Sequence, residues 1–178
     1  ISWQGKHHIL TITDKVTTGE PYFVELEHHQ PSLLASEIQD EIKKETIKAL
    51  NALEIQYGAS HSEFKITAEG KVYAIEVGAR MGGDFIGSDL VFLSTGYDFV
   101  KGVLEVALGE FNKPIVSNNM FSGVFFLSKE TEHYLDYFMH TNEFDYKKKY
   151  VQTELKNIKE SNDRSGYLIY QATKKIQL

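Results

Sequence analysis

Two glutamates, Glu63 and Glu76, have the residue type and spacing best suited to chemistry. They lie in residues 62–67 and 72–77, two β-prone segments on either side of the turn at residues 68–71. Two-residue and four-residue loops both place the glutamates directly opposite each other, whereas a three-residue loop with a bulge is expected to separate them. Like charges opposed on a sheet are destabilising unless something lies between them. A divalent cation would fill that place, so the hairpin predicts a metal site.

The same register divides the side chains of the hairpin between two faces. Large apolar residues are expected to form a core face: Phe64, Ile66, Tyr73, Ile75 and Val77. The polar face carries Glu63 and Glu76 together with His61, Lys65 and Gly78. Carboxylate oxygens suit Mg²⁺ or Mn²⁺, and a nucleotide phosphate commonly completes their coordination. The alternative is two surface glutamates balanced by Lys65.

The residues after the second glutamate add groups that bind anions. Arg80 lies four residues beyond Glu76 and projects to the same face of an extended chain. Its guanidinium can hold a phosphate or carboxylate bidentately, or it can neutralise the two glutamates. Gly82 and Gly83 precede an expected helix, where their backbone N–H groups can approach an anion. Two carboxylates, an arginine and a glycine turn together indicate a site for phosphate chemistry.

A second polar cluster, residues 25–32, lies where a strand is expected to end and a long helix to begin. Adjacent histidines on a strand point to opposite faces, so at most one of His28 and His29 should reach a given site. His61 shares the face of Glu63 and is a stronger candidate than His7, His8, His133 or His140. A structural or surface role is the alternative for each of them.

Composition narrows the classes of function. The chain of 178 residues has a net charge of −6, which argues against a nucleic-acid partner, and its one basic run, residues 147–149, is expected to be a solvated surface. It contains no Cys, which excludes disulfides and thiol chemistry and is compatible with the expected cytoplasmic location. No membrane segment or signal peptide is visible, and no membrane partner is expected. The start at Ile1 suggests a fragment of a longer chain.

Periodicity and turn residues predict the elements that must position these groups. We expect strands at 7–13, 22–28, 122–127, 150–155 and 167–173 around the hairpin, and helices from about 31 to Gly58, at 85–95, at 99–108 and at 128–138. Asp84 and Asp98 are expected to cap the second and third helices, and Gly96 and Gly109 to end them. The order indicates an α+β fold with a mixed or antiparallel sheet.

These motifs, in their order, resemble the C-terminal part of the ATP-grasp superfamily, which includes biotin carboxylase, the large subunit of carbamoyl-phosphate synthetase and the L-amino-acid ligases. The resemblance covers residues 23–106 and, more loosely, the tail, where residues 162–167 are similar to the ligase branch. It implies an ATP-grasp lobe at 1–116 followed by a small α+β subdomain at 117–178. Several residues receive roles from it: Glu63 and Glu76 hold Mg²⁺ (or Mn²⁺) on the phosphates of ATP, Arg80 stabilises the phosphate of an acyl-phosphate intermediate, Gly82 and Gly83 shape the pocket, and Glu25, His28 and His61 lie near the substrate.

The implied function is that of a carboxylate–amine ligase, with a small-molecule carboxylate and an amine as substrates and a homodimer as one possible assembly. The sequence departs from the family at Gly78, where an Asn usually provides a further metal ligand. The family's N-terminal ATP-binding lobe has no counterpart here, so it is an expected partner from the same protein, and the fragment alone is expected to be inactive. The alternatives are a reaction of the biotin-carboxylase or carbamoyl-phosphate type, and a non-catalytic binding module.

Overall fold

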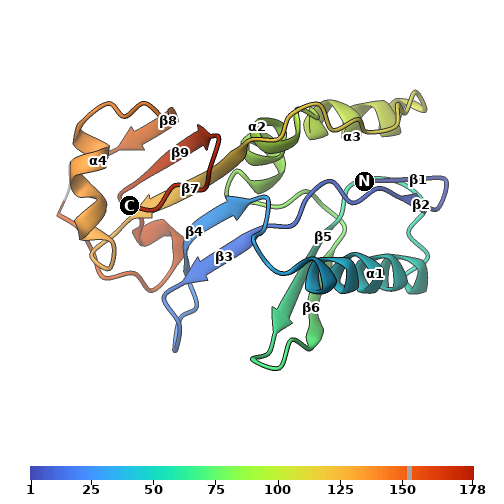
Figure 1. The fold of residues 1–178 in the computed structure, drawn as a ribbon, viewed down its shortest axis with the longest axis horizontal. Helices are drawn as coiled ribbons and strands as arrows, with labels where there is room; N and C mark the ends of the chain where they lie inside the picture. Colours follow the sequence, from blue (N-terminus) through green and yellow to red (C-terminus); the bar gives the residue numbers. More distant parts are fainter. Residues whose placement is uncertain (152–153) are drawn as a thin grey trace.

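A five-stranded antiparallel sheet organises the chain in the computed structural model, which describes residues 1–151 and 154–178 (Figure 1). The strands follow the order β3 (Asp14–Thr17), β4 (Glu25–Gln30), β7 (Phe121–Leu127), β9 (Gly166–Ala172) and β8 (Asp145–Tyr150). Strands on both sides of the predicted boundary at residues 116 and 117 therefore share one sheet. The division into two parts stays a prediction.

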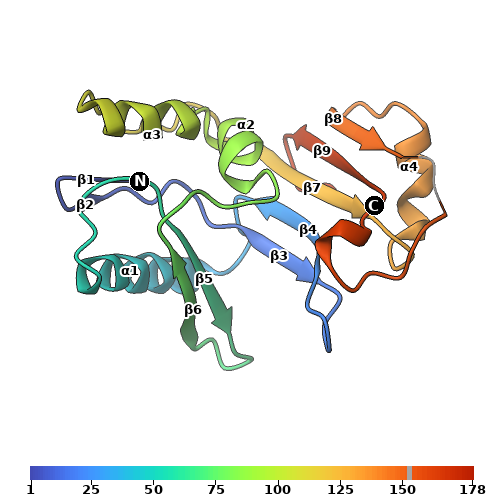
Figure 2. The same cartoon turned by 180° about the vertical axis from the view of Figure 1, so that it is seen from behind.

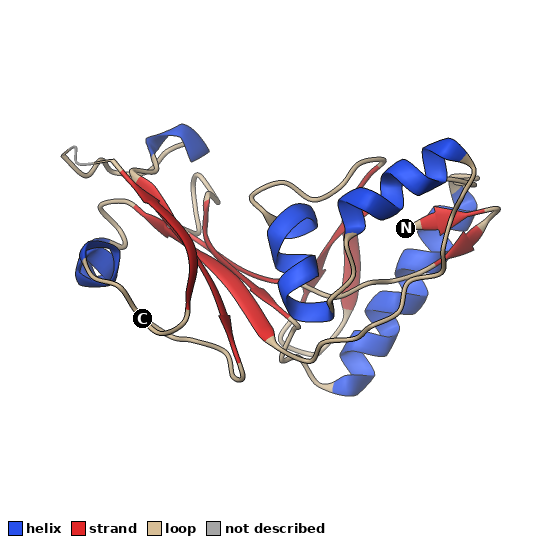
Figure 3. Ribbon diagram, turned by 90° about the horizontal axis from the view of Figure 1, so that it is seen from above, coloured by secondary structure: helices blue, strands red, loops and turns tan. Residues whose placement is uncertain are grey.

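The candidate hairpin and the long helix lie beside this sheet, on the side away from β8 and α4 (Figures 2 and 3). The hairpin consists of β5 (His61–Ile66) and β6 (Val72–Gly78), and α1 (Ser36–Ala52) packs against it. A short hairpin of β1 (Ser2–Trp3) and β2 (Lys6–His7) and helix α3 (Phe99–Leu108) complete this end. The architecture is α+β, as the order of elements predicted.

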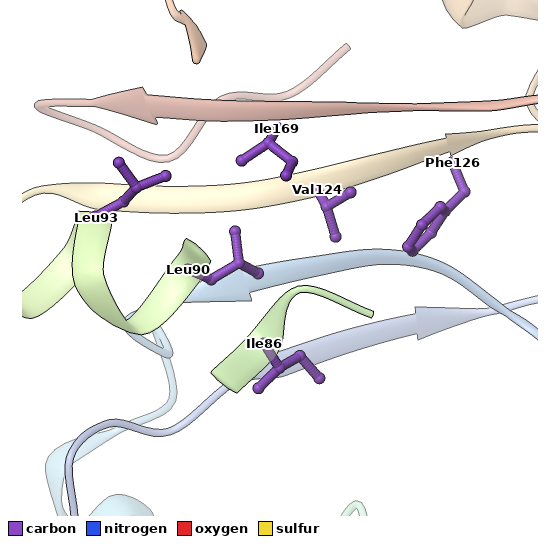
Figure 4. Packing of buried hydrophobic residues seen from close by; sticks show 6 residues of the cluster. All are labelled: Ile86, Leu90, Leu93, Val124, Phe126 and Ile169. Carbon is purple, nitrogen blue, oxygen red and sulfur yellow. The ribbon is translucent and has the colours of Figure 1, made fainter. Parts of the chain in front are cut away.

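Both faces of the large sheet are covered. On one face, the π-helix η1 (Ile86–Leu90) and helix α2 (Val91–Thr95) pack Leu90 and Leu93 against β7 and β9, and Ile86 belongs to the same cluster (Figure 4). On the other face, η2 (Glu132–Tyr134) and α4 (Leu135–Met139) bury Tyr134 and Phe138. Because neither face of β7 meets solvent, this strand is apolar almost throughout rather than alternating.

Several predicted elements are confirmed. The hairpin and the two long strands β7 and β9 lie within a residue of their predicted positions. Asp98 caps α3 by accepting a hydrogen bond of 2.9 Å from the backbone N–H of Lys101. Gly96 and Gly109 end their helices with φ of 76° and 78°, left-handed values that glycine adopts without strain.

The start of the chain differs from the prediction. Only His7 of the predicted strand 7–13 lies in a strand, as the last residue of β2, and the next strand begins at Asp14. Helix α1 begins at Ser36, five residues after the predicted Pro31, and Ala52 ends it well before Gly58. After the helix, Glu54 adopts the left-handed conformation with φ of 56°. The N–H of Ile55 then donates a hydrogen bond to the carbonyl of Leu50 at the helix end.

Two predictions in the second half of the chain are also wrong. Ser128 does not begin a helix, because its N–H donates to the Thr131 hydroxyl and the helical turns start at Glu132. The predicted strand 150–155 is instead β8 at Asp145–Tyr150, and residues 152–153 lie outside the described part of the chain. The basic run 147–149 lies on this edge strand, where lysines discourage pairing with another chain. Within the described residues, no helix is long and apolar enough to cross a membrane.

Candidate active site

Glu63 and Glu76 are paired across β5 and β6, as predicted, but the register changes once to achieve this. The loop at residues 68–70 is closed by the N–H of Thr67 on the carbonyl of Lys71, and it pairs Phe64 with Ala74. A bulge between Phe64 and Glu63 then makes Ile75 an extra residue on β6. The expectation that a three-residue loop would separate the glutamates is therefore wrong, because the bulge compensates for the loop.

The predicted core face of the hairpin is only partly correct. Phe64 and Ile66 line a cavity of about 450 Å³, whereas Tyr73 and Ile75 are 53% and 63% exposed. The reason is the register: Tyr73 lies opposite Lys65 and shares its face, rather than facing the cavity with Ile66, and Ile75 is the extra residue of the bulge.

Lys15 connects the two predicted clusters, and sequence reasoning missed it. Its Nζ lies 2.5 Å from Glu63 Oε1 and 3.6 Å from Glu25 Oε1, so β3 supplies a cation between the hairpin and β4. Burial opposes ionisation of Glu63, but the hydrogen bond and charge of Lys15 outweigh it and hold the pKa of Glu63 below its ordinary value. Residue 15 falls between the strands that the sequence predicts, so no local pattern points to it.

Glu76 and Arg80 are exposed and lie on either side of Gly78. A Cβ at Gly78 would be 3.6 Å from Glu76 Oε1 and 3.6 Å from Arg80 Cγ, and Arg80 itself donates to the carbonyl of Met81 at 2.9 Å. Within the described residues, no group of three or more His, Cys, Asp or Glu side chains could hold a metal. Two carboxylates alone suit Mg²⁺ that shares its remaining positions with phosphate and water.

A polar pocket of about 220 Å³ lies next to the glutamate pair. It brings together three predicted substrate residues, Glu25, His28 and His61, and one predicted glycine, Gly83, with these neighbours: Lys15, Asp84, Ile86 and Ser161. Gly82 lies behind its wall, where a Cβ would come within 2.8 Å of Ile86 Cγ2 and 3.2 Å of His61 Cδ2. That these residues lie close together does not test the roles predicted for them, which stay predictions.

A family model described as the ATP-grasp domain matches residues 1–89. The chain belongs to the ATP-grasp family. An L-amino acid ligase from Bacillus licheniformis is 26% identical, with a TM-score of 0.78, over 97% of this chain and 45% of the other. Two further structures show the fold. Phosphoribosylglycinamide synthetase from Anaerococcus prevotii is 17% identical, with a TM-score of 0.76, over 97% of this chain and 46% of the other. The biotin carboxylase domain of a Hydrogenobacter thermophilus 2-oxoglutarate carboxylase, in complex with MgADP, ADP and bicarbonate, is 19% identical, with a TM-score of 0.64, over 92% of this chain and 38% of the other.

No curated protein matches the chain. The chain spans less than half the length of the three solved structures described above. The activity of the whole protein is therefore a proposal.

The two adjacent histidines of this ATP-grasp chain point to opposite faces of β4, as predicted. His28 is 1% exposed, its Nε2 lies 3.5 Å from Asp84 Oδ2, and its Nδ1 has no hydrogen-bond partner within the described residues. His29 lies on the other face, with Nδ1 2.9 Å from the Tyr170 hydroxyl and Nε2 2.7 Å from Glu27 Oε2. Only His28 reaches the pocket.

Asp84 is not the helix cap that the sequence predicted. It has a φ of 48° and its side chain turns away from the helix, toward His28 and Arg164. Burial opposes its ionisation, but the hydrogen bond from His28 and the charge of Arg164 prevail and lower the pKa of Asp84. The sequence analysis included Arg164 only within residues 162–167, as similar to the ligase branch, and gave it no role in the site, because it lies far along the chain in a polar loop.

His61 is a neutral neighbour of the glutamate pair at neutral pH. Its Nδ1 lies 3.8 Å from Glu63 Oε1, but burial and the charge of Lys15 lower its pKa below the ordinary value. It therefore offers a hydrogen-bonding imidazole rather than a positive charge.

Proposed function

We propose that this chain forms part of an ATP-dependent carboxylate–amine ligase in which Glu63 and Glu76 hold Mg²⁺. The observation that carries the proposal is the direct opposition of two glutamates on paired strands, an arrangement that costs energy unless cations offset both charges. The ion pair of Lys15 with Glu63 offsets one of the two charges. The likeness to an L-amino acid ligase over almost the whole chain supports a ligase.

The proposed reaction has two steps. The substrate carboxylate attacks the γ-phosphate of ATP to give an acyl phosphate and ADP, and the amine then attacks the acyl carbon and expels phosphate. Negative charge develops on the transferring phosphoryl group, so fixed positive charge lowers the barrier. Mg²⁺, when bound, would neutralise that charge on the phosphate oxygens.

The chain's own cations take complementary parts in this proposal. Arg80 is exposed beside Gly78 and is free to hold a phosphate or carboxylate bidentately once it leaves the Met81 carbonyl. In the absence of a metal, Lys15 neutralises Glu63. A metal that binds Glu63 would release the Lys15 ammonium toward the polar pocket, which Lys15 lines. Glu25, His28 and His61 would contact the organic substrate.

The substitution Glu76→Gln in the full-length protein tests the metal role. ATP turnover should fall to background while the circular dichroism spectrum stays unchanged, because the amide keeps the shape but loses the charge. Glu69→Gln, on the loop of the same hairpin, is the matched control and should retain turnover. Normal turnover by Glu76→Gln would reject the proposal.

Gly78 favours a second candidate, a non-catalytic binding module, because it removes a side-chain ligand beside the glutamates. Calorimetry separates the two candidates. A ligase predicts that Mn²⁺ and ATP bind the full-length protein in a coupled manner, whereas a module predicts no coupling. A biotin-carboxylase or carbamoyl-phosphate reaction would also show coupling, and product analysis would identify it.

A further inference from the structure

Arg164 lies just before β9, directly after the short helix η3 (Ser161–Asp163), and its side chain is only 8% exposed. Its Cζ lies 3.8 Å from the centroid of the Phe126 ring, so the guanidinium rests on the apolar face of β7. A buried charge of this kind is costly unless it is paired and hydrogen-bonded.

The guanidinium is satisfied by two segments that are distant in sequence. Its Nη1 donates to Asp84 Oδ2 at 2.9 Å, and its Nη2 donates to Glu25 Oε2 at 3.2 Å. The carbonyl oxygen of Glu25 accepts from Nη2 at 2.8 Å and from Nε at 3.2 Å. The planar guanidinium of Arg164 therefore links Glu25, the first residue of β4, to Asp84, which follows the two glycines.

Both residues that Arg164 holds line the polar pocket, whereas Arg164 itself does not. Ser161, at the start of the same η3 segment, also lines it. The C-terminal part of the chain thus builds one wall of the pocket directly and fixes two of its carboxylates from behind.

We propose that Arg164 is a positioning residue of this pocket: it keeps Glu25 and Asp84 oriented so that both accept hydrogen bonds from donor groups of the organic substrate. The substrate part of this inference rests on the proposed function. The position of the Arg164 guanidinium does not rest on the proposed function, since it follows from four hydrogen bonds within the chain. A purely structural Arg164 would stabilise the fold without controlling the pocket.

The first experiment measures the pocket without any substrate. The carboxyl pKa of Asp84 is followed by ¹³C NMR in this chain and in its Arg164→Met and Arg164→Lys variants. The groups that surround Asp84 are His28 from β4, Arg164 before β9 and, in the same pocket, Lys15, Glu25 and His61. We expect the pKa of Asp84 to rise by at least one unit in Arg164→Met and by less in Arg164→Lys.

Two controls separate this effect from a loss of folding. Lys149→Gln removes one positive charge from the neighbouring strand β8 and should leave the pKa of Asp84 unchanged. Arg164→Ala with added methylguanidine should regain a low pKa of Asp84, because the small cation can enter the space of the lost side chain. If Arg164→Met folds, an unchanged pKa of Asp84 would overturn the proposal. If Arg164→Met does not fold, failure of methylguanidine to restore a low pKa of Asp84 in Arg164→Ala would overturn it.

The second experiment uses ADP release by the full-length protein with a mixture of L-amino acids as probe. Arg164→Lys should raise the half-saturating concentration of the mixture about tenfold and leave the KM of ATP within about twofold. An equal fall in kcat for both substrates, without any change in KM, would overturn the substrate part. Absence of turnover by the unsubstituted protein would count against the proposed function, and the Asp84 titration would then decide the role of Arg164 alone.

Discussion

Glu63 lies directly opposite Glu76 because one bulge cancels one slip of register. The loop at residues 68–70 shifts the pairing by one residue, and the extra residue Ile75 shifts it back before the glutamates are reached. A one-residue slip that persisted would send the two carboxylates to different faces. The two irregularities are therefore a matched pair, and the bulge lies directly beside the candidate metal site.

Replacing Gly78 with Asn should strengthen metal binding. A Cβ there makes only ordinary contacts, at 3.6 Å from both Glu76 Oε1 and Arg80 Cγ, so the side chain fits and its amide oxygen lies near the carboxylates. We expect Mn²⁺ to bind about tenfold more tightly, equivalent to about 1.4 kcal/mol. Titration calorimetry on Gly78→Asn and Gly78→Ala checks this, and equal affinities would show that the amide does not reach the metal.

The two predicted glycines of the pocket should tolerate substitution differently. A Cβ at Gly82 would meet Ile86 Cγ2 at 2.8 Å, whereas a Cβ at Gly83 has no atom within 4 Å. Gly82→Ala should therefore lower the free energy of unfolding by about 1–3 kcal/mol. Gly83→Ala should stay within about 0.5 kcal/mol. Urea unfolding of both variants gives the comparison, and equal losses would show that Ile86 does not confine residue 82.

Glu27 should make the fold sensitive to acid. Burial opposes its ionisation, but hydrogen bonds from His29 and Tyr134 outweigh it and lower the pKa of Glu27 below its ordinary value of 4.5. A carboxyl with a lowered folded-state pKa stabilises above its unfolded pKa, and this contribution is lost as pH falls through the folded pKa. Glu27→Gln should cost about 1–2 kcal/mol at pH 7.

That cost should shrink at pH 3, where the carboxyl is increasingly protonated. Urea unfolding at both pH values measures the difference. The exposed Glu143→Gln serves as the control and should change stability little at either pH. A cost for Glu27→Gln that does not depend on pH would show that ionised Glu27 adds no stability.

Removing Lys15 should favour the metal in the absence of nucleotide. The ammonium lies 2.5 Å from Glu63 Oε1, so a cation that binds Glu63 must displace it. Because both side chains are partly exposed, the competing ion pair is worth at most about 1 kcal/mol, and Lys15→Met should tighten Mn²⁺ binding about two- to fivefold. Lys65→Met removes a charge from the same hairpin without breaking that ion pair and should have a smaller effect.

Local signals in the sequence are sufficient for part of this structure. The opposition of Glu63 and Glu76, the Asp98 cap and the terminal glycines Gly96 and Gly109 each depend on residues that are close along the chain. The bulge at Ile75 leaves no such signal, because a β-branched residue suits either register equally well.

The remaining parts of the site depend on contacts between distant segments. Lys15 meets Glu63 across 48 residues and Arg164 meets Glu25 across 139, and neither contact leaves a periodic pattern. The sequence predicts a helix cap at Asp84 because Asp before an apolar run usually is one. In the folded chain, a buried arginine competes for the same carboxylate and prevails.

The order of the strands in the large sheet also determines when the pocket can form during synthesis. Strand β4, which carries Glu25 and His28, pairs with β7 on one side, and α1, the β5–β6 hairpin and helices α2 and α3 are all made between them. Until β7 emerges from the ribosome, β4 presents an unpaired edge, and unpaired edges promote aggregation. An expression clone that stops at residue 89, where the family match ends, would leave that edge open permanently, so clones of this region should extend through β9.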